Sequence, residues 1–139
     1  MSRRCETFEH TADIGLRAWA DTLAELYQAL AECLAEQVCP RESVQPREER
    51  RLAVSAEDRE ALAVDFLSRL VAVMQGELLL VRDVEVCMAG AAGLEATLRG
   101  ERYDPARHEL GEEIKAVTYH LLQVRQEGDG WTGRVVLDV

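Results

Sequence analysis

The sequence contains no long hydrophobic run. Although 47% of its 139 residues are apolar, no stretch approaches the roughly 18 to 20 apolar residues that a membrane-spanning helix needs. The opening residues Met-Ser-Arg-Arg lead into Cys-Glu-Thr and not into the apolar stretch of a signal peptide. The sequence therefore predicts a cytoplasmic protein without membrane association, and its length fits a single compact domain.

Cysteine pairs and basic residues are also scarce. The four cysteines contain no CxxC motif, which excludes a zinc ribbon or a thioredoxin-type site based on that spacing and favours reduced thiols. Sixteen bases against 26 acids give a net charge of −10. Such a chain repels a phosphate backbone unless its bases are gathered on one face. We therefore expect no tight direct binding to RNA.

Two segments near the N-terminus show clear periodicity. Residues 16–20 alternate apolar and larger side chains, which predicts a half-buried strand. Thr22 and Glu25 have the spacing of a capping box, and apolar residues then recur every three or four positions. This pattern predicts a helix that ends at Cys39-Pro40.

The same order of elements recurs in the middle of the chain. A short strand around residues 52–54 precedes a predicted cap at Ser55 and a helix that Gly76 closes. Two alternating strands follow, "LLLVRDVEVCM" and "LEATLRGERY", separated by the turn "AGAAG". In the first of these strands, four apolar residues share one parity: Leu80, Val84, Val86 and Met88.

The first strand and helix find two partner strands only at the end of the chain, in residues 114–125 and 131–138 around the turn "EGDG". We therefore predict an α+β fold in which one strand-helix-strand-strand module is inserted into a second such module. The whole chain, residues 1–139, forms one domain, with an outer module of about residues 1–45 and 105–139 and an inserted module of about residues 46–104. A single α+β sandwich is the alternative.

This nesting predicts that Asp13 and Asp138 become neighbours at the ends of their strands. Two carboxylates in one site need a compensating cation, and the α-carboxylate of Val139 adds further oxygen atoms. Oxygen ligands are those that calcium and magnesium prefer. On residue type alone, an Asp before a glycine is also typical of a turn, and a terminal Asp is also typical of a free chain end.

Three stretches together resemble the archease family: "FEHTADIGLRAWADTLAELYQALAECL", "EIKAVTYHLLQV" and the ending "GWTGRVVLDV". The most specific parts are "HTADIG" from His10, "KAVTYH" from Lys115, and the final Asp138-Val139. The resemblance extends over nearly the whole chain, and it implies the same nested pair of modules.

The resemblance also implies a function. Archeases are protein cofactors, not enzymes, of the RtcB-type RNA ligase, which acts in tRNA splicing and RNA repair. They promote the GTP-dependent guanylylation of that ligase and permit multiple turnover. The family's metal ligands carry over to Asp13, Asp138 and the terminal carboxylate of Val139. The resemblance thus implies a divalent cation, namely calcium, with magnesium or manganese as alternatives.

Other residues of the two motifs receive supporting roles. We expect His10 to orient the Asp13 loop by a hydrogen bond, with direct metal ligation as the alternative. Thr11 and Gly15 are expected to be structural. Lys115 is either a contact to the ligase or its nucleotide, or a solvated strand lysine.

Strict alternation would put Lys115 and His120 on opposite faces of one strand unless a bulge intervenes. His120 and Tyr119 are expected to be packed residues of the sheet.

Two further functions stay open. One is a metal-dependent hydrolase that uses Asp13 and Asp138, although the sequence has no HExxH, Walker lysine loop or GxSxG motif. The other is a protein-binding module without a metal.

Overall fold

The computed structural model describes residues 3–10 and 13–139. It contains a mixed set of strands and helices, in chain order: β1 (Arg3–His10), β2 (Asp13–Ala20), α1 (Leu23–Val38), a 3-10 turn (Arg41–Ser43), β3 (Glu48–Ser55), α2 (Arg59–Val71), a π-helical turn (Ala72–Gly76), β4 (Leu79–Met88), β5 (Gly93–Arg102), β6 (Ala116–Glu127) and β7 (Gly130–Asp138).

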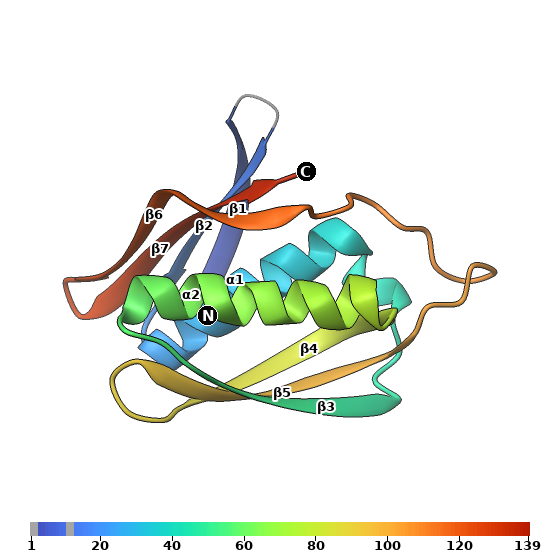
Figure 1. The fold of residues 1–139 in the computed structure, drawn as a ribbon, viewed down its shortest axis with the longest axis horizontal. Coiled ribbons are helices and arrows are strands. Elements are labelled where there is room, and N and C mark those ends of the chain that lie inside the picture. Colours follow the sequence, from blue (N-terminus) through green and yellow to red (C-terminus); the bar gives the residue numbers. More distant parts are fainter. Residues whose placement is uncertain (1–2, 11–12) are drawn as a thin grey trace.

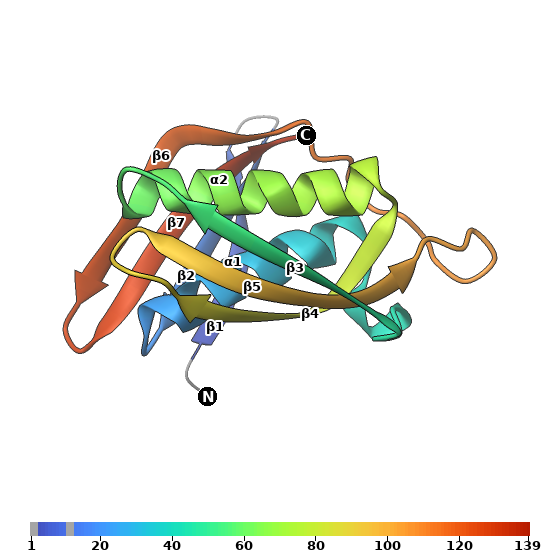
Figure 2. The same ribbon diagram turned by 60° about the horizontal axis from the view of Figure 1, so that its bottom comes forward.

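The strands form two antiparallel sheets with the two helices between them (Figures 1 and 2). The four-stranded sheet has the order β1-β2-β7-β6 and joins the two ends of the chain. The three-stranded sheet has the order β3-β5-β4 and is built from the middle of the chain. Helix α1 packs against β2 of one sheet and β4 of the other, while α2 packs against β6 and β3. The two sheets confirm the predicted α+β fold. The unit from the middle of the chain is inserted into the unit that the two ends of the chain form.

Helix α1 begins where the capping box predicts. The hydroxyl of Thr22 accepts a hydrogen bond from the backbone N–H of Glu25 at 3.2 Å. The helix ends at Val38, with Cys39 as its C-cap. Its apolar stripe is buried between the sheets, and Leu26, Leu30 and Leu34 have no exposed surface. Capping and burial therefore agree on the same helix.

Helix α2 begins three residues later than predicted. Its N-cap is Asp58, whose carboxylate accepts from the N–H of Ala61 at 2.8 Å, whereas Ser55 is the last residue of β3. Both residue types cap helices, so the sequence allowed either start. Gly76 does not close the helix in a left-handed conformation. A π-helical turn ends there, and the positive φ of 57° falls on Leu78.

Strand β4 breaks its predicted alternation. Its register with β5 shifts between Val81 and Asp83, so the parity of Leu80 does not continue into Val84. Leu79, Leu80 and Val81 are nevertheless all buried. A bulge therefore corrects the single-parity prediction for this strand.

Strand β1 was not predicted from the sequence. Residues 3–10 pair with β2 along its whole length, from Arg3 opposite Ala20 to His10 opposite Asp13. Residues 8–10 and 13–15 of the stretch "FEHTADIG" therefore lie on two paired strands, whereas a loop was predicted at Asp13. Among the described residues, neither helix is long and apolar enough to cross a bilayer.

Candidate metal centre

The two candidate aspartates lie at one end of the four-stranded sheet. The register of β2 with β7 runs as far as Ile14 opposite Leu137. One further step of this antiparallel register puts Asp13 opposite Asp138. Directly opposite residues share a face of the sheet, with Cβ atoms about 4.5–5.5 Å apart. The fold thus brings together two carboxylates from the two ends of the chain.

The donor set at this end fits a hard divalent cation. Both aspartates are half-buried, and Val139 follows Asp138 directly with its side chain packed against the core. Carboxylate oxygens are the ligands that calcium prefers. In the described part of the chain, no cluster of three or more His, Cys, Asp or Glu side chains forms a metal site. The two side chains alone are therefore an incomplete ligand set, and the contribution of the α-carboxylate of Val139 stays a prediction.

Strand β6 fixes Asp138 from the other side. Ala116 lies opposite Asp138, and the backbone N–H of Lys115 donates to the carbonyl of Asp138 at 2.7 Å. The side-chain amide of Gln75 in turn binds both backbone groups of buried Ile114, at 2.7 Å and 2.8 Å. This amide works as a substitute strand partner and holds the start of β6. No spacing in the sequence indicated that role for Gln75.

The HTADIG motif is described only in part. The backbone of His10 pairs with that of Asp13, which places the two residues side by side on adjacent strands. The side chain of His10 and the whole of Thr11 lie outside the described residues, so their predicted roles stay predictions.

Gly15 serves close packing and not an unusual backbone conformation. It is absent from the glycines with positive φ, among those that the structure describes. A Cβ at this position would lie 2.2 Å from the ring of Phe8. The ring therefore crosses the strand next to the candidate site because residue 15 has no side chain.

Lys115 is exposed immediately before β6 and is the only lysine of the chain. The following strand does not alternate strictly, because its register with β7 shifts between Thr118 and Gln123, and Leu121 has a φ of 56°. Tyr119 is 64% exposed and His120 is also exposed. The prediction that these two residues are packed in the sheet was wrong, since an irregular edge strand turns them outward.

The electrostatics of this end differ from those elsewhere in the molecule. Neither Asp13 nor Asp138 forms an ion pair with any described residue. Buried Glu101, by contrast, accepts a hydrogen bond from Arg107, another from the backbone N–H of Gln45 at 2.7 Å, and lies 3.0 Å from His108. These contacts, that of Arg107 above all, lower the pKa of Glu101 from 4.5 to about 2. The charge of Glu101 is thus compensated within the protein, whereas no ion pair to Asp13 or Asp138 occurs among the residues that the structure describes.

The fold and this acidic chain end define a small two-sheet α+β protein with a potential oxygen-ligand cation site. The profile of the Archease protein family (MTH1598/TM1083) matches residues 5–139. The chain belongs to the archease family.

Similar proteins support this assignment. Protein archease of Pyrococcus abyssi is 38% identical over 141 residues, and that of Thermococcus gammatolerans is 39% identical over 141 residues, with 99% of each chain covered in both cases. The solution structure of Methanobacterium thermoautotrophicum protein 1598 has a TM-score of 0.79 and 29% identity, covering 97% of this chain and 98% of that one. The crystal structure of an archease, described as a possible chaperone, from Thermotoga maritima has a TM-score of 0.70 and 27% identity, with 96% of each chain covered.

Proposed function

We propose that this protein is a cytoplasmic, non-catalytic activator of an RtcB-type RNA ligase. It promotes the GTP-dependent guanylylation of the ligase and permits repeated turnover in tRNA splicing and RNA repair. Membership of the archease family supports a helper role, as does the description of the Thermotoga maritima relative as a possible chaperone. The observation that carries the proposal is the pairing of β2 with β7, which brings Asp13 and Asp138 to one end of the sheet.

In this proposal, Asp13, Asp138 and the terminal carboxylate of Val139 hold a divalent cation, which is calcium, with magnesium and manganese as alternatives. Such an ion would supply a concentrated positive charge to the phosphate oxygens of a nucleotide. The chain's own residues position these ligands, because backbone pairing with β6 and β1 fixes both aspartates. Lys115, exposed beside Asp138, is suited to contact a nucleotide phosphate or an acidic patch of the ligase.

Reconstitution tests the proposal. The protein is added in substoichiometric amount to the cognate ligase with GTP, calcium and a cleaved RNA, and guanylylation and ligation turnovers are counted. We expect several turnovers per ligase with the wild type and a loss of at least about tenfold with Asp13→Asn. Asp65→Asn, at an exposed position of α2, removes the same charge far from the site and is the matched control.

The same samples separate the other two functions. A phosphoesterase assay without ligase measures the hydrolase activity, and a titration with EDTA measures dependence on the cation. Phosphate release by the protein alone would favour the hydrolase. Ligase binding that is unchanged by EDTA and by Asp13→Asn, without stimulation of turnover, would favour a metal-free binding module.

A further inference from the structure

The outer face of the four-stranded sheet gathers basic residues in a protein that is acidic overall. Side chains alternate along each strand, so the residues opposite Trp19 and Arg17 share their face and point away from the core. We call the part of this surface formed by Arg4, Phe8, Arg17, Trp19, Arg125 and Arg134 the arginine face. By the same alternation it also contains two glutamates, Glu6 at 3.8 Å from Arg17 and Glu127 at 3.5 Å from Arg125. The aspartates of the candidate metal centre lie at one end of the same side of the sheet. The arginine face thus has four positive charges against two negative ones, whereas the whole chain has a net charge of −10.

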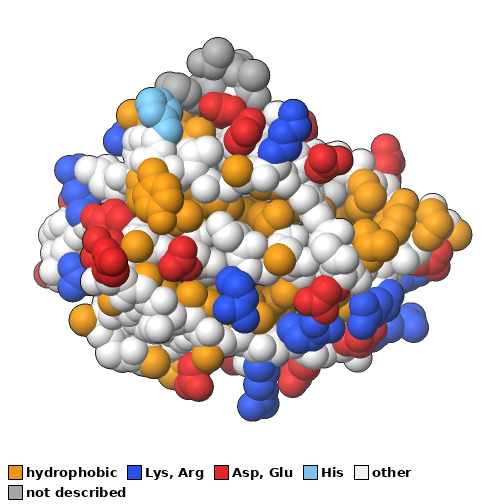
Figure 3. All heavy atoms as spheres, viewed as in Figure 1, with side chains coloured by type: hydrophobic (Ala, Val, Ile, Leu, Met, Phe, Trp, Pro, Cys, Tyr) orange, Lys and Arg blue, Asp and Glu red, His pale blue; other side chains and the backbone are white. Residues whose placement is uncertain are grey.

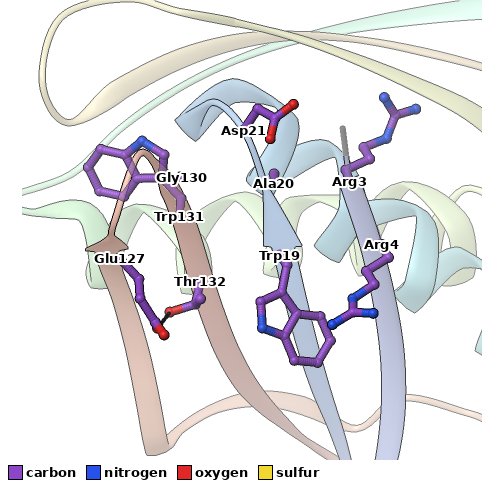
Figure 4. Close-up of a pocket in the computed structure, with 9 residues that line it drawn as sticks. All are labelled: Arg3, Arg4, Trp19, Ala20, Asp21, Glu127, Gly130, Trp131 and Thr132. Atoms are coloured by element: carbon purple, nitrogen blue, oxygen red, sulfur yellow. Dashed lines mark hydrogen bonds between the residues drawn. The ribbon is translucent and has the colours of Figure 1, made fainter. Parts of the chain in front are cut away.

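One row of the arginine face crosses all four strands. Arg4 lies opposite Trp19, Trp19 opposite Thr132, and Thr132 opposite Arg125. The guanidinium of Arg4 stacks on the indole of Trp19 at 4.2 Å from the ring centroid. Figure 4 shows these two side chains on neighbouring strands. They line an open hollow of about 510 Å³, which Asp21 and Glu127 also line. Planar groups are thus presented outward at this end of the face.

The next row sets two positive charges against each other. Arg17 lies directly opposite Arg134 on the adjacent strand. The only acid paired with Arg17 among the described residues is Glu6, at 3.8 Å, and both side chains are about half exposed, at 41% and 57%. Arg134 donates to the backbone carbonyl of Leu121 at 2.8 Å. Like charges opposite each other destabilise a sheet, and an anion on this face would relieve that repulsion.

The outer face of the three-stranded sheet is built differently. There, Arg99 lies between Glu49 at 3.2 Å and Glu85 at 3.8 Å, so its charge is compensated within the sheet. Figure 3 shows acidic and basic side chains intermixed along the lower side of the molecule, where β3 and β5 lie. Opposed arginines are therefore a particular feature of one sheet and not a general consequence of an arginine-rich composition.

We propose that the arginine face binds single-stranded RNA. Guanidinium groups suit phosphate oxygens, and both guanidinium planes and indole rings stack on unpaired bases. An acidic peptide would use the charges but not the stacked planes of Arg4 and Trp19, so RNA matches the face better. The inference goes beyond the proposed function and does not depend on it, because it concerns this chain without a ligase.

The overall charge limits the strength of this binding. Acidic residues elsewhere repel the RNA, so the complex forms at low salt and is weak at physiological salt, in line with the expected lack of tight RNA binding. With about four phosphate contacts to single-stranded RNA, the affinity should fall roughly 50-fold between 50 mM and 200 mM salt.

Fluorescence anisotropy of a labelled 12-nucleotide single-stranded RNA tests the inference at 50 mM salt. The variant Arg4→Ala/Arg125→Ala should bind at least about tenfold more weakly than the wild type. The matched control is Arg51→Ala/Arg99→Ala on the outer face of the three-stranded sheet, which removes the same two charges. We expect less than a twofold change there. Trp19→Leu should weaken binding about fivefold or more if its ring stacks on a base.

Far-ultraviolet circular dichroism and melting curves show whether each variant folds, and Trp19→Phe, which keeps a ring, should restore most of the affinity if Trp19→Leu loses stability. Three results would overturn the inference: no RNA binding by the wild type at 50 mM salt, equal losses for both arginine pairs, or tighter binding of a 12-residue polyglutamate peptide than of the RNA. The last result would make a protein the partner of this face.

Discussion

The two sheets differ in how their charged side chains are paired. In the three-stranded sheet, Arg99 is flanked by Glu49 and Glu85, and buried Glu101 is bound by Arg107. In the four-stranded sheet, Arg17 lies opposite Arg134, and one further step beyond the last recorded pair, Ile14 with Leu137, would put Asp13 opposite Asp138. Two arginines are thus opposed in one sheet, where Arg17 has a single acidic partner, Glu6 at 3.8 Å, whereas Arg99 in the other sheet lies between two glutamates.

This difference separates structural charges from those available to ligands. A charge that is already paired within the protein stabilises the fold and interacts only weakly with a ligand. Two like charges on adjacent strands lower the stability of the sheet, and local violations of this kind are expected at functional sites. This is the reason for proposing a cation at the aspartate pair and RNA phosphates at the arginine pair.

The largest effect should follow from converting the aspartate pair into a pair of opposite charges, like the pairs in the three-stranded sheet. Asp13→Lys would replace two opposed negative charges by a cross-strand ion pair with Asp138. We expect the free energy of unfolding without cation to rise by about 1 kcal/mol, while stimulation of ligase guanylylation falls at least about 100-fold. Chemical denaturation and the guanylylation rate measure the two quantities.

Asp13→Asn is the companion variant, since it removes the repulsion without creating an ion pair. A protein with Asp13→Lys that still stimulates the ligase to half the wild-type level would show that the aspartate pair has no part in activation.

A C-terminal tag should have the next largest effect. Extension beyond Val139 converts the predicted α-carboxylate into a neutral amide and crowds the end of β7, so we expect about a tenfold loss of ligase stimulation. An N-terminal tag should be milder. Arg3 belongs to β1, but it pairs with Ala20 at the opposite end of the sheet, about 23 Å along β2 from Asp13. Equal guanylylation rates for tag-free, N-tagged and C-tagged proteins would remove Val139 from the ligand set.

Glu101, whose charge is paired with Arg107, should affect the stability of the fold and not the stimulation of the ligase. Its pKa of about 2 lies below the usual 4.5, so its contribution is fully present above pH 4.5 and is lost as the pH falls toward 2. Glu101→Gln should therefore lower the free energy of unfolding by about 2 kcal/mol at pH 7. The difference from the wild type should shrink between pH 4.5 and 2 in urea titrations. A difference that is constant over this range would mean that the charge of Glu101 is not what stabilises the fold.

The smallest effect is expected at the surface of the three-stranded sheet. Arg99→Ala breaks two exposed ion pairs, each of a kind that contributes about 0.2–1 kcal/mol. Thermal unfolding should show a loss of about 0.5 kcal/mol at low salt and less at high salt. A loss above 2 kcal/mol would show that these pairs stabilise the sheet far more than exposed pairs normally do.

Local signals in the sequence were sufficient for the first helix and for the pairing of the chain ends. Thr22 and Glu25 fixed the start of α1, and alternation on both sides of "EGDG" predicted the β6–β7 hairpin, which joins at Glu127 and Gly130. The neighbourhood of Asp13 and Asp138 followed from that topology. These features depend on contacts within a few residues or on a simple period.

The features that escaped prediction depend on contacts between distant segments. The irregular part of β6 has no glycine to indicate it, since the positive φ falls on Leu121. The clamp between Gln75 and Ile114 joins two segments whose proximity only the tertiary fold provides. The face formed by Arg17 and Arg134 likewise depends on the exact pairing of β2 with β7, and a shift of one residue would point one of them into the core.

A calorimetric calcium titration shows whether Asp13 and Asp138 form a cation site. The wild type, Asp13→Asn, the C-terminally extended protein and the control Asp65→Asn are titrated under the same conditions without ligase. We expect one site in the wild type and in Asp65→Asn, no detectable binding to Asp13→Asn, and clearly weakened binding to the extended protein. Calcium binding to Asp13→Asn with wild-type stoichiometry and affinity would contradict this expectation.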